Sequence, residues 1–395
     1  MIDKKIKISL VIITAIPFPF GLAGTNRIIS YSKGLVELGN KVTVLTSNFH
    51  ENGLNDQYDG ICFKGFRKRH KLNGLNKIDL PFAVIRQISY LFRTAREYDA
   101  VLVVSNSLIL ILLTYLVCKI RQLKLIQEKS EFPFVLNRKG LLRRWYAQLY
   151  VNNVYYLFDG MIIMTYPLFE YFKDKTKRGC RKIIVPMTVE PERFINANVN
   201  KTLGDYIAYC GYMGGNKDGV VNLINAFSIL EKKYDQIKLL LIGTAEDSEL
   251  LELKKIVCDL NVKNIVFYGS VARHEMPPLL CGAKVLALAR PSSLQSTGGF
   301  PTKLGEYLAT GKPVVVTKVA DIPRYLEDGE NAYLVEPDDN SAFAEKLGFV
   351  LSHYEDALQT AQKGKELTNT VFNYKIQSRR IQDFFISWLN AVDIV

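Results

Sequence analysis

The stretch GGFPTKLGEYLATGKPVV, residues 298–315, decides the fold of this chain. A turn at Gly298, Gly299 and Pro301 is followed by a short helix and, after Gly-Lys-Pro, by an apolar strand. Glycines ahead of a helix let a ligand approach the backbone, and the amides of the first helical turn favour an anion. Two interpretations follow: a turn that only packs, or a phosphate site with Glu306 one turn further on to accept a ribose diol.

The same alternation of strand and helix runs through all 395 residues. Strand-length apolar runs such as KISLVII, KVTVLTS and YDAVLVVS in the first half, and YIAYC, IKLLLIG and VLALAR in the second, are separated by amphipathic segments. This pattern predicts an α/β chain of two Rossmann-like, doubly wound parallel-sheet domains that face a cleft. We expect the domains at 1–187 and 200–375, with a C-terminal helix, 376–395, joining the first.

The charge of the chain limits the classes of partner. Lys and Arg number 51 against 39 Asp and Glu, a net charge of +12, which suits phosphorylated ligands or an anionic membrane surface. We exclude nucleic acid, because the sequence has no zinc-finger spacing and no RNP-like aromatic motif.

The six cysteines are scattered without a CxxC pair, which favours free thiols in a reducing compartment and a cytoplasmic protein. The basic, apolar start resembles a signal peptide, but we interpret it as a first buried strand.

Two features raise the question of a membrane. The run 101–120 is almost free of charge and long enough to span a bilayer, but Ser105, Asn106 and Ser107 interrupt it. We therefore interpret it as a strand followed by a core helix. The segments 63–71 and 136–153 interleave cations with apolar residues, which predicts either peripheral contact with the inner face of the cell membrane or a solvated basic surface.

Several common kinds of chemistry lack their residues. No Asp-x-Asp occurs to clamp a metal–diphosphate, and the four histidines (His50, His70, His274 and His353) are too far apart to predict a metal site. The sequence has no G-x-S-x-G elbow and no G-x-G-x-x-G loop after its first strand. The Gly-Lys pair at 311–312 is followed by Pro313, where a P-loop needs Ser or Thr. The sequence thus predicts no metal and no cofactor.

Loop-to-helix junctions at strand ends remain as candidate sites. The first is PFGLAGTNR, 19–27, and the second is CGYMGGNKDG, 210–219, which adds Lys217 to Gly211, Gly214 and Gly215. The third is the opening stretch. There Lys303 comes early in the helix, where a cation opposes the helix dipole unless an anion is bound nearby. Arg290, at the end of the strand VLALAR, is expected to point toward the same place.

These residues carry a resemblance to a known family. The segments 206–227, 237–247, 264–280, 298–317 and 322–339 resemble, in order, the donor domain of the retaining glycosyltransferases of family four, which have the GT-B fold. In the first half, 24–47 and 185–194 resemble the acceptor domain of that family. The resemblance covers nearly the whole chain, and FPTKLGEYLATGKPVV is similar to the branch that assembles surface polysaccharides.

The resemblance implies a donor site. Lys217 would contact the donor diphosphate, Glu306 would hold the ribose, and Gly24 would approach the diphosphate from the other domain. With Arg290, Lys217 and Glu306 form the implied catalytic set. The full implied donor set is Gly24, Gly211, Gly214, Lys217, Tyr268, Gly269, Val271, Arg290, Gly299, Phe300, Pro301, Thr302, Lys303, Leu304 and Glu306. The amides of 300–304 would cap the phosphates, and the backbone of 268–271 would border the base.

The chain departs from the family at two positions. The first acid of the E-x₇-E motif is replaced by Gly298, and the arginine of the family's "GR" turn is replaced by Tyr212. Arg290 and Lys303 are expected to supply the missing positive charge. On the acceptor side we expect Arg27, Glu128 and Glu131, although salt bridging explains the two acids equally well.

The resemblance implies an activity. We expect transfer of a sugar, with retention, from a nucleoside-diphosphate sugar to a glycan or lipid-linked saccharide acceptor. The leaving phosphate would itself draw the acceptor proton, so no protein nucleophile is required. One alternative is a non-catalytic nucleotide-sugar binder or partner subunit, which the loss of the first acid favours. Another is an inverting or epimerase-type enzyme on the same fold, for which the sequence offers no obvious set of acids and histidine.

Overall fold

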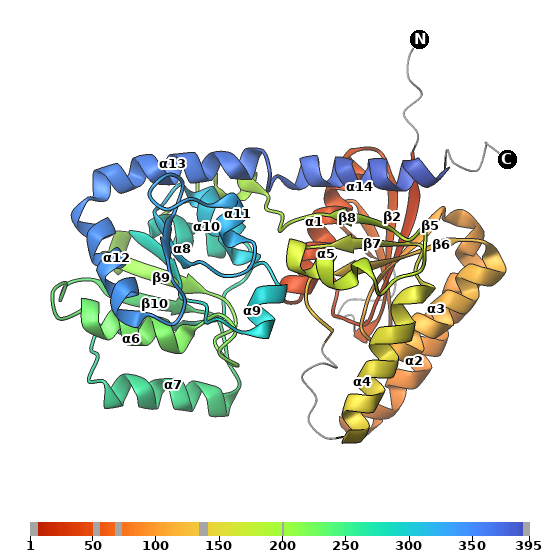
Figure 1. Cartoon of the computed structure of the whole chain (residues 1–395), viewed down its shortest axis with the longest axis horizontal. Coiled ribbons are helices and arrows are strands. Elements are labelled where there is room, and N and C mark those ends of the chain that lie inside the picture. The colour runs from red at the N-terminus through yellow and green to blue at the C-terminus, as the bar shows by residue number, and fades with distance from the viewer. Residues whose placement is uncertain (1–6, 50–55, 68–72, 134–140, 200, 390–395) are drawn as a thin grey trace, which may run out of the picture. The chain divides into compact units, whose positions relative to one another are not determined.

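The computed structural model describes residues 7–49, 56–67, 73–133, 141–199 and 201–389. The chain divides into two compact units. Unit 1 comprises Met1–Pro186 and Tyr374–Val395, and unit 2 comprises Met187–Asn373. Figure 1 shows their elements along the chain.

Unit 1 is built on an eight-stranded sheet with the order β3-β4-β2-β1-β5-β6-β7-β8. All neighbours pair in parallel except β3 and β4, which form an antiparallel hairpin. The strands are β1 (Ser9–Thr14), β2 (Lys41–Phe49), β3 (Asp56–Tyr58), β4 (Ile61–Arg67), β5 (Ala100–Val104), β6 (Lys124–Lys129), β7 (Gly160–Ile163) and β8 (Arg181–Ile184).

The first strand confirms the interpretation of the apolar start. β1 lies between β2 and β5, with Leu10 opposite Val42 and Ala100. Its apolar side chains are buried on both faces, as expected for an inner strand of a parallel sheet. Helices then cover the sheet: α1 (Ala23–Glu37), α2 (Asn73–Thr94), α3 (Leu108–Arg121), α4 (Leu141–Asn153), α5 (Tyr166–Lys173) and α14 (Tyr374–Leu389).

The last helix, α14, belongs to the core of unit 1. It packs on α1, where a Cβ at Gly34 would come within 2.3 Å of the Ser378 hydroxyl, so only glycine allows this approach. Ile381, Phe385 and Trp388 of α14 join the core formed by β1, β2 and β5. The sheet of unit 1 is thus closed on this face by the end of the chain.

The run 101–120 is only partly as expected. It forms β5 and then α3, as predicted. The description of α3 as a core helix is wrong, because one side of it is exposed along its whole length. Among the described residues, no helix is both long and apolar enough to cross a bilayer. Of the two basic segments, residues 68–71 and 136–140 lie outside the described residues.

Unit 2 is built on a six-stranded sheet in the order β11-β10-β9-β12-β13-β14, with every pair parallel. This is the order of a doubly wound fold, in which the chain reverses direction across the sheet between β9 and β12. The strands are β9 (Tyr206–Cys210), β10 (Lys238–Ile242), β11 (Ile265–Gly269), β12 (Val285–Leu288), β13 (Val314–Thr317) and β14 (Tyr333–Val335).

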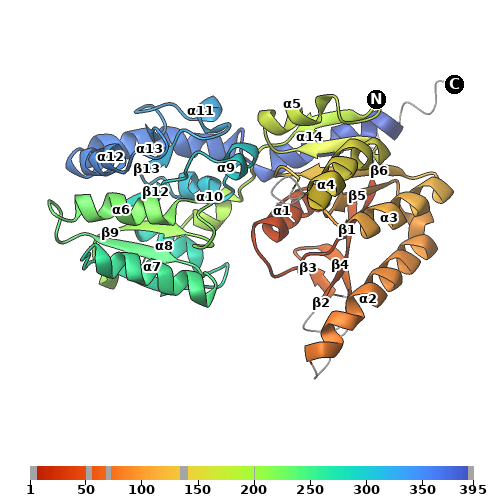
Figure 2. The same cartoon turned by 60° about the horizontal axis from the view of Figure 1, so that its bottom comes forward.

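Helices lie on both sides of this sheet (Figures 1 and 2). One group contains α6 (Val220–Leu230), α7 (Asp247–Asp259) and α12 (Asn340–Ser352), which contact one another through α6. The other contains α8 (Met276–Gly282), α10 (Lys303–Thr310) and α13 (Tyr354–Asn369), which meet through α10. Two short helices, α9 (Leu294–Gly298) and α11 (Ile322–Tyr325), lie in loops after β12 and β13.

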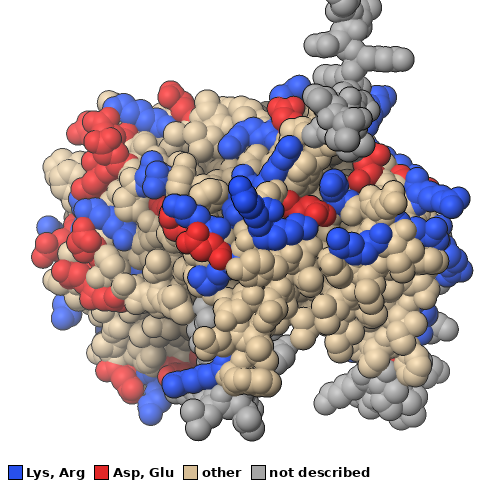
Figure 3. All heavy atoms as spheres, turned by 45° about the vertical axis from the view of Figure 1, so that its right-hand side comes forward, with Lys and Arg blue, Asp and Glu red and all other residues tan. Residues whose placement is uncertain are grey.

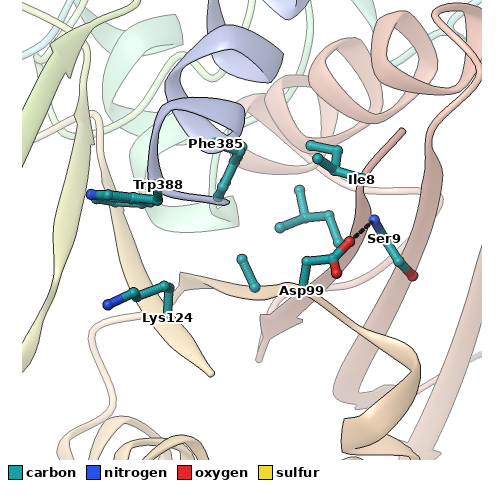
Figure 4. A pocket seen from close by; sticks show the side chains of 8 residues that line it. Ile8, Ser9, Asp99, Lys124, Phe385 and Trp388 are labelled. Atoms are coloured by element: carbon teal, nitrogen blue, oxygen red, sulfur yellow. Dashed lines mark hydrogen bonds between the residues drawn. The ribbon is translucent and has the colours of Figure 1, made fainter. Parts of the chain in front are cut away.

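Two hollows lie at the amino-terminal edges of the sheets. In unit 1, Phe385 and Trp388 of α14 cover a small, mainly apolar hollow at the start of β1, β5 and β6 (Figure 4). Its acid, Asp99, accepts a hydrogen bond from the Ser9 amide at 2.7 Å and so holds the start of β1. In unit 2, a wider hollow lies beside Asp205 and Lys284. Doubly wound sheets bind ligands at the opposite, carboxyl edge, so we look there for the site.

Candidate functional site

The candidate site lies where the loops after β9 and β12 meet in unit 2. Gly219, at the end of the first loop, has φ +69°, and a Cβ there would lie 1.7 Å from the Ala289 carbonyl oxygen. Only glycine therefore allows the two loops to touch. The contact is at the point where the strand order reverses, which is the usual ligand site of this topology.

A buried ion pair forms the centre of the site. Lys303, the first residue of α10, places its Nζ 2.6 Å from Asp218 Oδ2 and 2.9 Å from the Tyr209 hydroxyl. The Lys303 and Asp218 side chains are only 12% and 16% exposed. Asp218 comes from the loop after β9 and Tyr209 from the strand itself. Lys303, the cation that opposes the helix dipole, is thus paired with an anion of the protein itself. This anion, Asp218, was not predicted from the sequence.

The pair keeps both groups charged. Burial alone would lower the pKa of Lys303, but Tyr209 and Asp218 outweigh it and raise that pKa above its ordinary value. Burial would likewise raise the pKa of Asp218, but Lys303 and Arg290 hold it below the usual range. The site therefore carries a fixed anion among cations at neutral pH.

Arg290 is buried within the junction toward which its side chain was expected to point. Its side chain is 1% exposed, with Nη1 donating to the Gly299 carbonyl at 3.1 Å and Nε lying 3.5 Å from Asp218 Oδ1. Nε also donates to the Lys217 carbonyl at 3.4 Å. Arg290 thus ties the loop after β9 to the residues before α10. A direct contact of this guanidinium with phosphate stays a prediction.

Glu306 lies on α10 one turn after Lys303, and its partner is a residue that the sequence analysis did not single out. Arg193 donates from Nη1 to Glu306 Oε1 at 2.6 Å, and from Nη2 to the Arg273 carbonyl at 2.8 Å. Arg273 in turn pairs with Glu190, which is buried. Arg193 therefore orients the Glu306 carboxylate and connects it to the loop after β11.

The glycine loop after β9 is held at its outer side. Glu249, near the start of α7, accepts from the Tyr212 hydroxyl and from the Gly215 amide at 2.9 Å. A Cβ at Gly214 would lie 1.9 Å from the same carboxylate, and one at Gly211 would lie 2.2 Å from Lys303 Nζ. Tyr212, which replaces the expected arginine, therefore fixes the loop through Glu249.

The start of α10 differs in detail from the prediction. The helix begins at Lys303, after Pro301 and Thr302, and Gly298 ends the unpredicted short helix α9. The Leu304 amide already donates to the Pro301 carbonyl at 3.0 Å, so it is not available to cap a phosphate. Phe300 is buried, and its ring packs at 5.7 Å from that of Tyr325.

The remaining predicted donor residues lie at the same edge of the sheet. Lys217 is half-buried in the loop after β9, Tyr268 and Gly269 end β11, and Val271 follows them. Tyr268 is exposed. Their proposed contacts with a diphosphate and a base stay predictions. Gly24 belongs to α1 of unit 1, where it is exposed, and its role also stays a prediction.

The predicted acceptor residues of unit 1 form a salt bridge. Arg27 Nε lies 2.6 Å from Glu128 Oε1, and the Arg27 guanidinium also donates to the carbonyls of Val185 and Pro186. Both side chains are buried, so this pair fixes the strand ends. Glu131 is exposed. The neighbouring Lys129 is buried, which lowers its pKa to about 8 although two acids oppose the shift.

The residues missed by sequence reasoning are those that hold others in place. Tyr307 is buried in α10, and its hydroxyl accepts from the Cys210 amide at 2.8 Å, which joins the helix to the end of β9. Asp218 sits beside Lys217 in the sequence, and this adjacency was the available signal. Arg193 lay in the segment 185–194, whose resemblance was to the acceptor domain and not to the donor site. Among the described residues, no three His, Cys, Asp or Glu side chains gather as a metal site would require.

Comparison with known proteins points to one family for unit 2. Residues 204–353 match the family described as glycosyl transferases group 1. A trehalose phosphorylase of Grifola frondosa is 41% identical over 54 residues, 14% of this chain and 7% of that protein. The amylovoran biosynthesis glycosyltransferase AmsK of Erwinia amylovora is 25% identical over 280 residues, 67% of this chain and 65% of that protein. The matches thus span less than two thirds of either relative.

Solved structures share the fold. The crystal structure of HepE from Anabaena in complex with UDP and glucose aligns with a TM-score of 0.73 at 15% identity, covering 96% of this chain and 100% of that chain. The predicted fold class, GT-B with two doubly wound domains, is confirmed.

Proposed function

We propose that the chain transfers a sugar from a nucleoside-diphosphate sugar to a glycan or lipid-linked saccharide, because residues 204–353 match the family described as glycosyl transferases group 1. The reaction proceeds with retention and serves the assembly of cell-surface polysaccharide. The similarity to AmsK supports the polysaccharide, and the UDP and glucose bound to HepE make UDP-glucose the first donor to test.

The observation that carries this proposal is the group of cations at the strand reversal of unit 2. Lys303 and Arg290 converge on Asp218 beside the glycine-rich contact between the loops after β9 and β12, and the charge of Lys217 lies near enough to help lower the pKa of Asp218. A leaving nucleoside diphosphate develops negative charge, which such cations and backbone amides stabilise. Loss of the first motif acid at Gly298 leaves this group intact.

Asp218 is proposed to hold the place of the donor's negative charge. The Asp218 carboxylate holds Lys303, and the donor diphosphate is proposed to take over part of the charge that Asp218 neutralises. Lys303 and Arg290 are thus held in place before the donor arrives, which reduces the cost of ordering them. Lys217 is proposed to contact the diphosphate from the same loop.

Glu306 is proposed to hold the ribose hydroxyls. Arg193 fixes one oxygen of its carboxylate at 2.6 Å, which leaves the other oxygen to accept from a diol. Because Arg193 also binds the loop after β11, it sets the position of Glu306 relative to the residues proposed to border the base.

The remaining parts of the proposal concern the acceptor and the setting. Glu131 is the candidate to orient the acceptor hydroxyl, because Glu128 is buried against Arg27. The leaving phosphate draws the acceptor proton, so neither a protein nucleophile nor a metal ion takes part. We place the reaction in the cytoplasm, where nucleotide sugars are the donors.

Calorimetric titration with UDP-, GDP-, ADP- and dTDP-linked sugars, without and with magnesium, tests the site. We expect one nucleotide family to bind in both conditions, and Glu306→Gln to weaken that binding at least about ten-fold, as for loss of a charged hydrogen bond. Glu330→Gln is the control, because Glu330 forms an exposed ion pair with Lys363 in the same unit.

Equal affinity of folded Glu306→Gln and Glu330→Gln would remove Glu306 from the site. Turnover separates the two function classes. Release of nucleoside diphosphate that depends on an added saccharide acceptor supports the transferase. Binding without any such release supports the non-catalytic partner subunit instead.

A further inference from the structure

One side of unit 1 exposes an apolar stripe along α3. Ile109, Leu112, Leu116 and Ile120 are all exposed, and their spacing of three and four residues places them on one face of the helix. The stripe is about 16 Å long at 1.5 Å per residue. The opposite side of α3, including Leu110 and Val117, is buried against the unit.

The neighbouring helices extend this stripe. Phe82, Ile85 and Phe92 of α2 are exposed, and α2 and α3 lie side by side in both views (Figures 1 and 2). On α4, Trp145 and Leu149 are exposed, and Tyr150 donates to the Asn106 carbonyl just before α3. We call these exposed residues of α2, α3 and α4 the apolar face. Exposed apolar side chains gathered on neighbouring helices in this way mark an interaction site.

The charges carried by the three helices of the apolar face are almost all positive. The three helices contain seven Lys and Arg and a single acid, Asp79, which is buried against Arg86 at 2.6 Å. Lys119, Arg93 and Arg144 are exposed at its margin. Figure 3 shows this side of the molecule as a broad area without charged side chains, with Lys and Arg, and some Asp and Glu among them, above it and further Lys and Arg at its right-hand edge.

We propose that the apolar face lies in the headgroup region of a bilayer that contains anionic lipid. Its aliphatic and aromatic side chains enter the acyl boundary while the surrounding cations contact lipid phosphates. A second copy of the chain is the less favourable occupant, because a two-fold interface would bring the same cations together. The proposal concerns unit 1 alone and does not depend on the transferase activity of unit 2.

Tryptophan fluorescence of the full chain tests this directly. The chain has two tryptophans; Trp145 on the apolar face is 66% exposed, whereas Trp388 in the core is 8% exposed. Vesicles of phosphatidylcholine with 30% phosphatidylglycerol are expected to shift the emission to the blue and to bring the protein into the vesicle pellet. The shift should vanish in Trp145→Phe, and binding should fall about five-fold for each cation removed at Lys119 or Arg144.

A matched pair of variants separates the apolar face from general hydrophobicity. Ile109→Ser with Leu116→Ser is expected to reduce partitioning roughly 30-fold, as for the loss of two half-exposed aliphatic side chains. The control, Leu251→Ser with Ile229→Ser, changes exposed residues of unit 2, and Leu251 is as exposed as Ile109 (68% and 67%). Phe82→Ser with Ile85→Ser provides a second test on α2.

Three results would overturn the proposal. The first is absence of the protein from the anionic vesicle pellet without a shift of Trp145 emission. The second is equal partitioning of the face variants and the unit 2 control. The third is a concentration-dependent dimer, measured by sedimentation, that the Ile109→Ser and Leu116→Ser changes abolish, because it would assign the face to a second copy of the chain.

Discussion

Asp218→Asn removes the anion from between two buried cations while keeping the shape of the side chain. In the protein Asp218 Oδ2 lies 2.6 Å from Lys303 Nζ, and Oδ1 lies 3.5 Å from Arg290 Nε. The substitution leaves the two cations side by side without a counter-charge. It should therefore destabilise unit 2 when no ligand is bound.

The size of the effect follows from burial. Arg290 is 1% exposed, and the Lys303 and Asp218 side chains are both below one fifth, so solvent screens the interaction little. Removing one partner of a buried pair costs about 3–5 kcal/mol, and we expect about 3 because the amide still accepts a hydrogen bond. The pKa of Asp218 is lowered by folding, so this stability is present at neutral pH and is lost as the pH falls below about 4.

Hydrogen exchange measured by mass spectrometry can locate the effect. Peptides from β9 and β12 should exchange faster in Asp218→Asn. The emission of Trp145 and Trp388 reports the unfolding of unit 1, and its midpoint in urea should stay the same. Asp205→Asn is the control, since Asp205 forms an exposed pair with Lys284 at 3.5 Å that is worth less than about 1 kcal/mol.

A ligand should reduce the difference in stability between Asp218→Asn and the parent protein. A nucleoside diphosphate or pyrophosphate supplies the missing negative charge, so it should protect Asp218→Asn more than the parent protein. Equal destabilisation by Asp218→Asn and Asp205→Asn would refute the buried-pair reasoning. Greater protection of the parent protein would refute the exchange of carboxylate for phosphate.

Two further predictions concern unit 1, and tryptophan emission during urea unfolding checks both. Lys129 has its pKa lowered to about 8, so stability should rise between about pH 8 and the ordinary lysine pKa near 10.5, and Lys129→Met should abolish this rise. Arg27→Ala should cost about 3–5 kcal/mol by leaving Glu128 buried and unpaired. Lys41→Ala, at an exposed pair, should cost less than about 1 kcal/mol; a similar cost for both would contradict the second prediction.

The strands could be predicted because their signal is local. A run such as KISLVII is buried on both faces of a parallel sheet, so its apolar residues need no alternation and stand out in the sequence. The glycine-rich loop after β9, with Gly211 and Gly214, stood out for the same reason, but the close approach of Gly219 to Ala289 was not predicted. Local composition thus predicted the class of fold and the loops that form the site.

The partners within the site could not be predicted. Lys303 was recognised as a cation in an unfavourable position on its helix, which is a local observation. Its anion, Asp218, lies 85 residues earlier, and no spacing rule connects the two. Arg193 and Glu306 are similarly separated by 113 residues. Ion pairs between loops depend on the order of the strands in the sheet. No local pattern in the sequence shows which loops that order brings together.

The exposed side of α3 was missed for a different reason. Its composition is so apolar that a buried helix was the natural interpretation. Burial depends on whether another element covers the helix, and only the inner side of α3 is covered. Apolar composition therefore predicted the helix but not its surroundings.

The place of α14 in unit 1 has a consequence for synthesis. Ribosomes deliver the chain from its N-terminus, and domains generally fold as they emerge. Unit 2 is continuous from Met187 to Asn373 and is complete before α14 leaves the ribosome. Unit 1, although made first, must wait for Ile381, Phe385 and Trp388 to fill its core. The half of the protein that is translated first is therefore the half that finishes folding last.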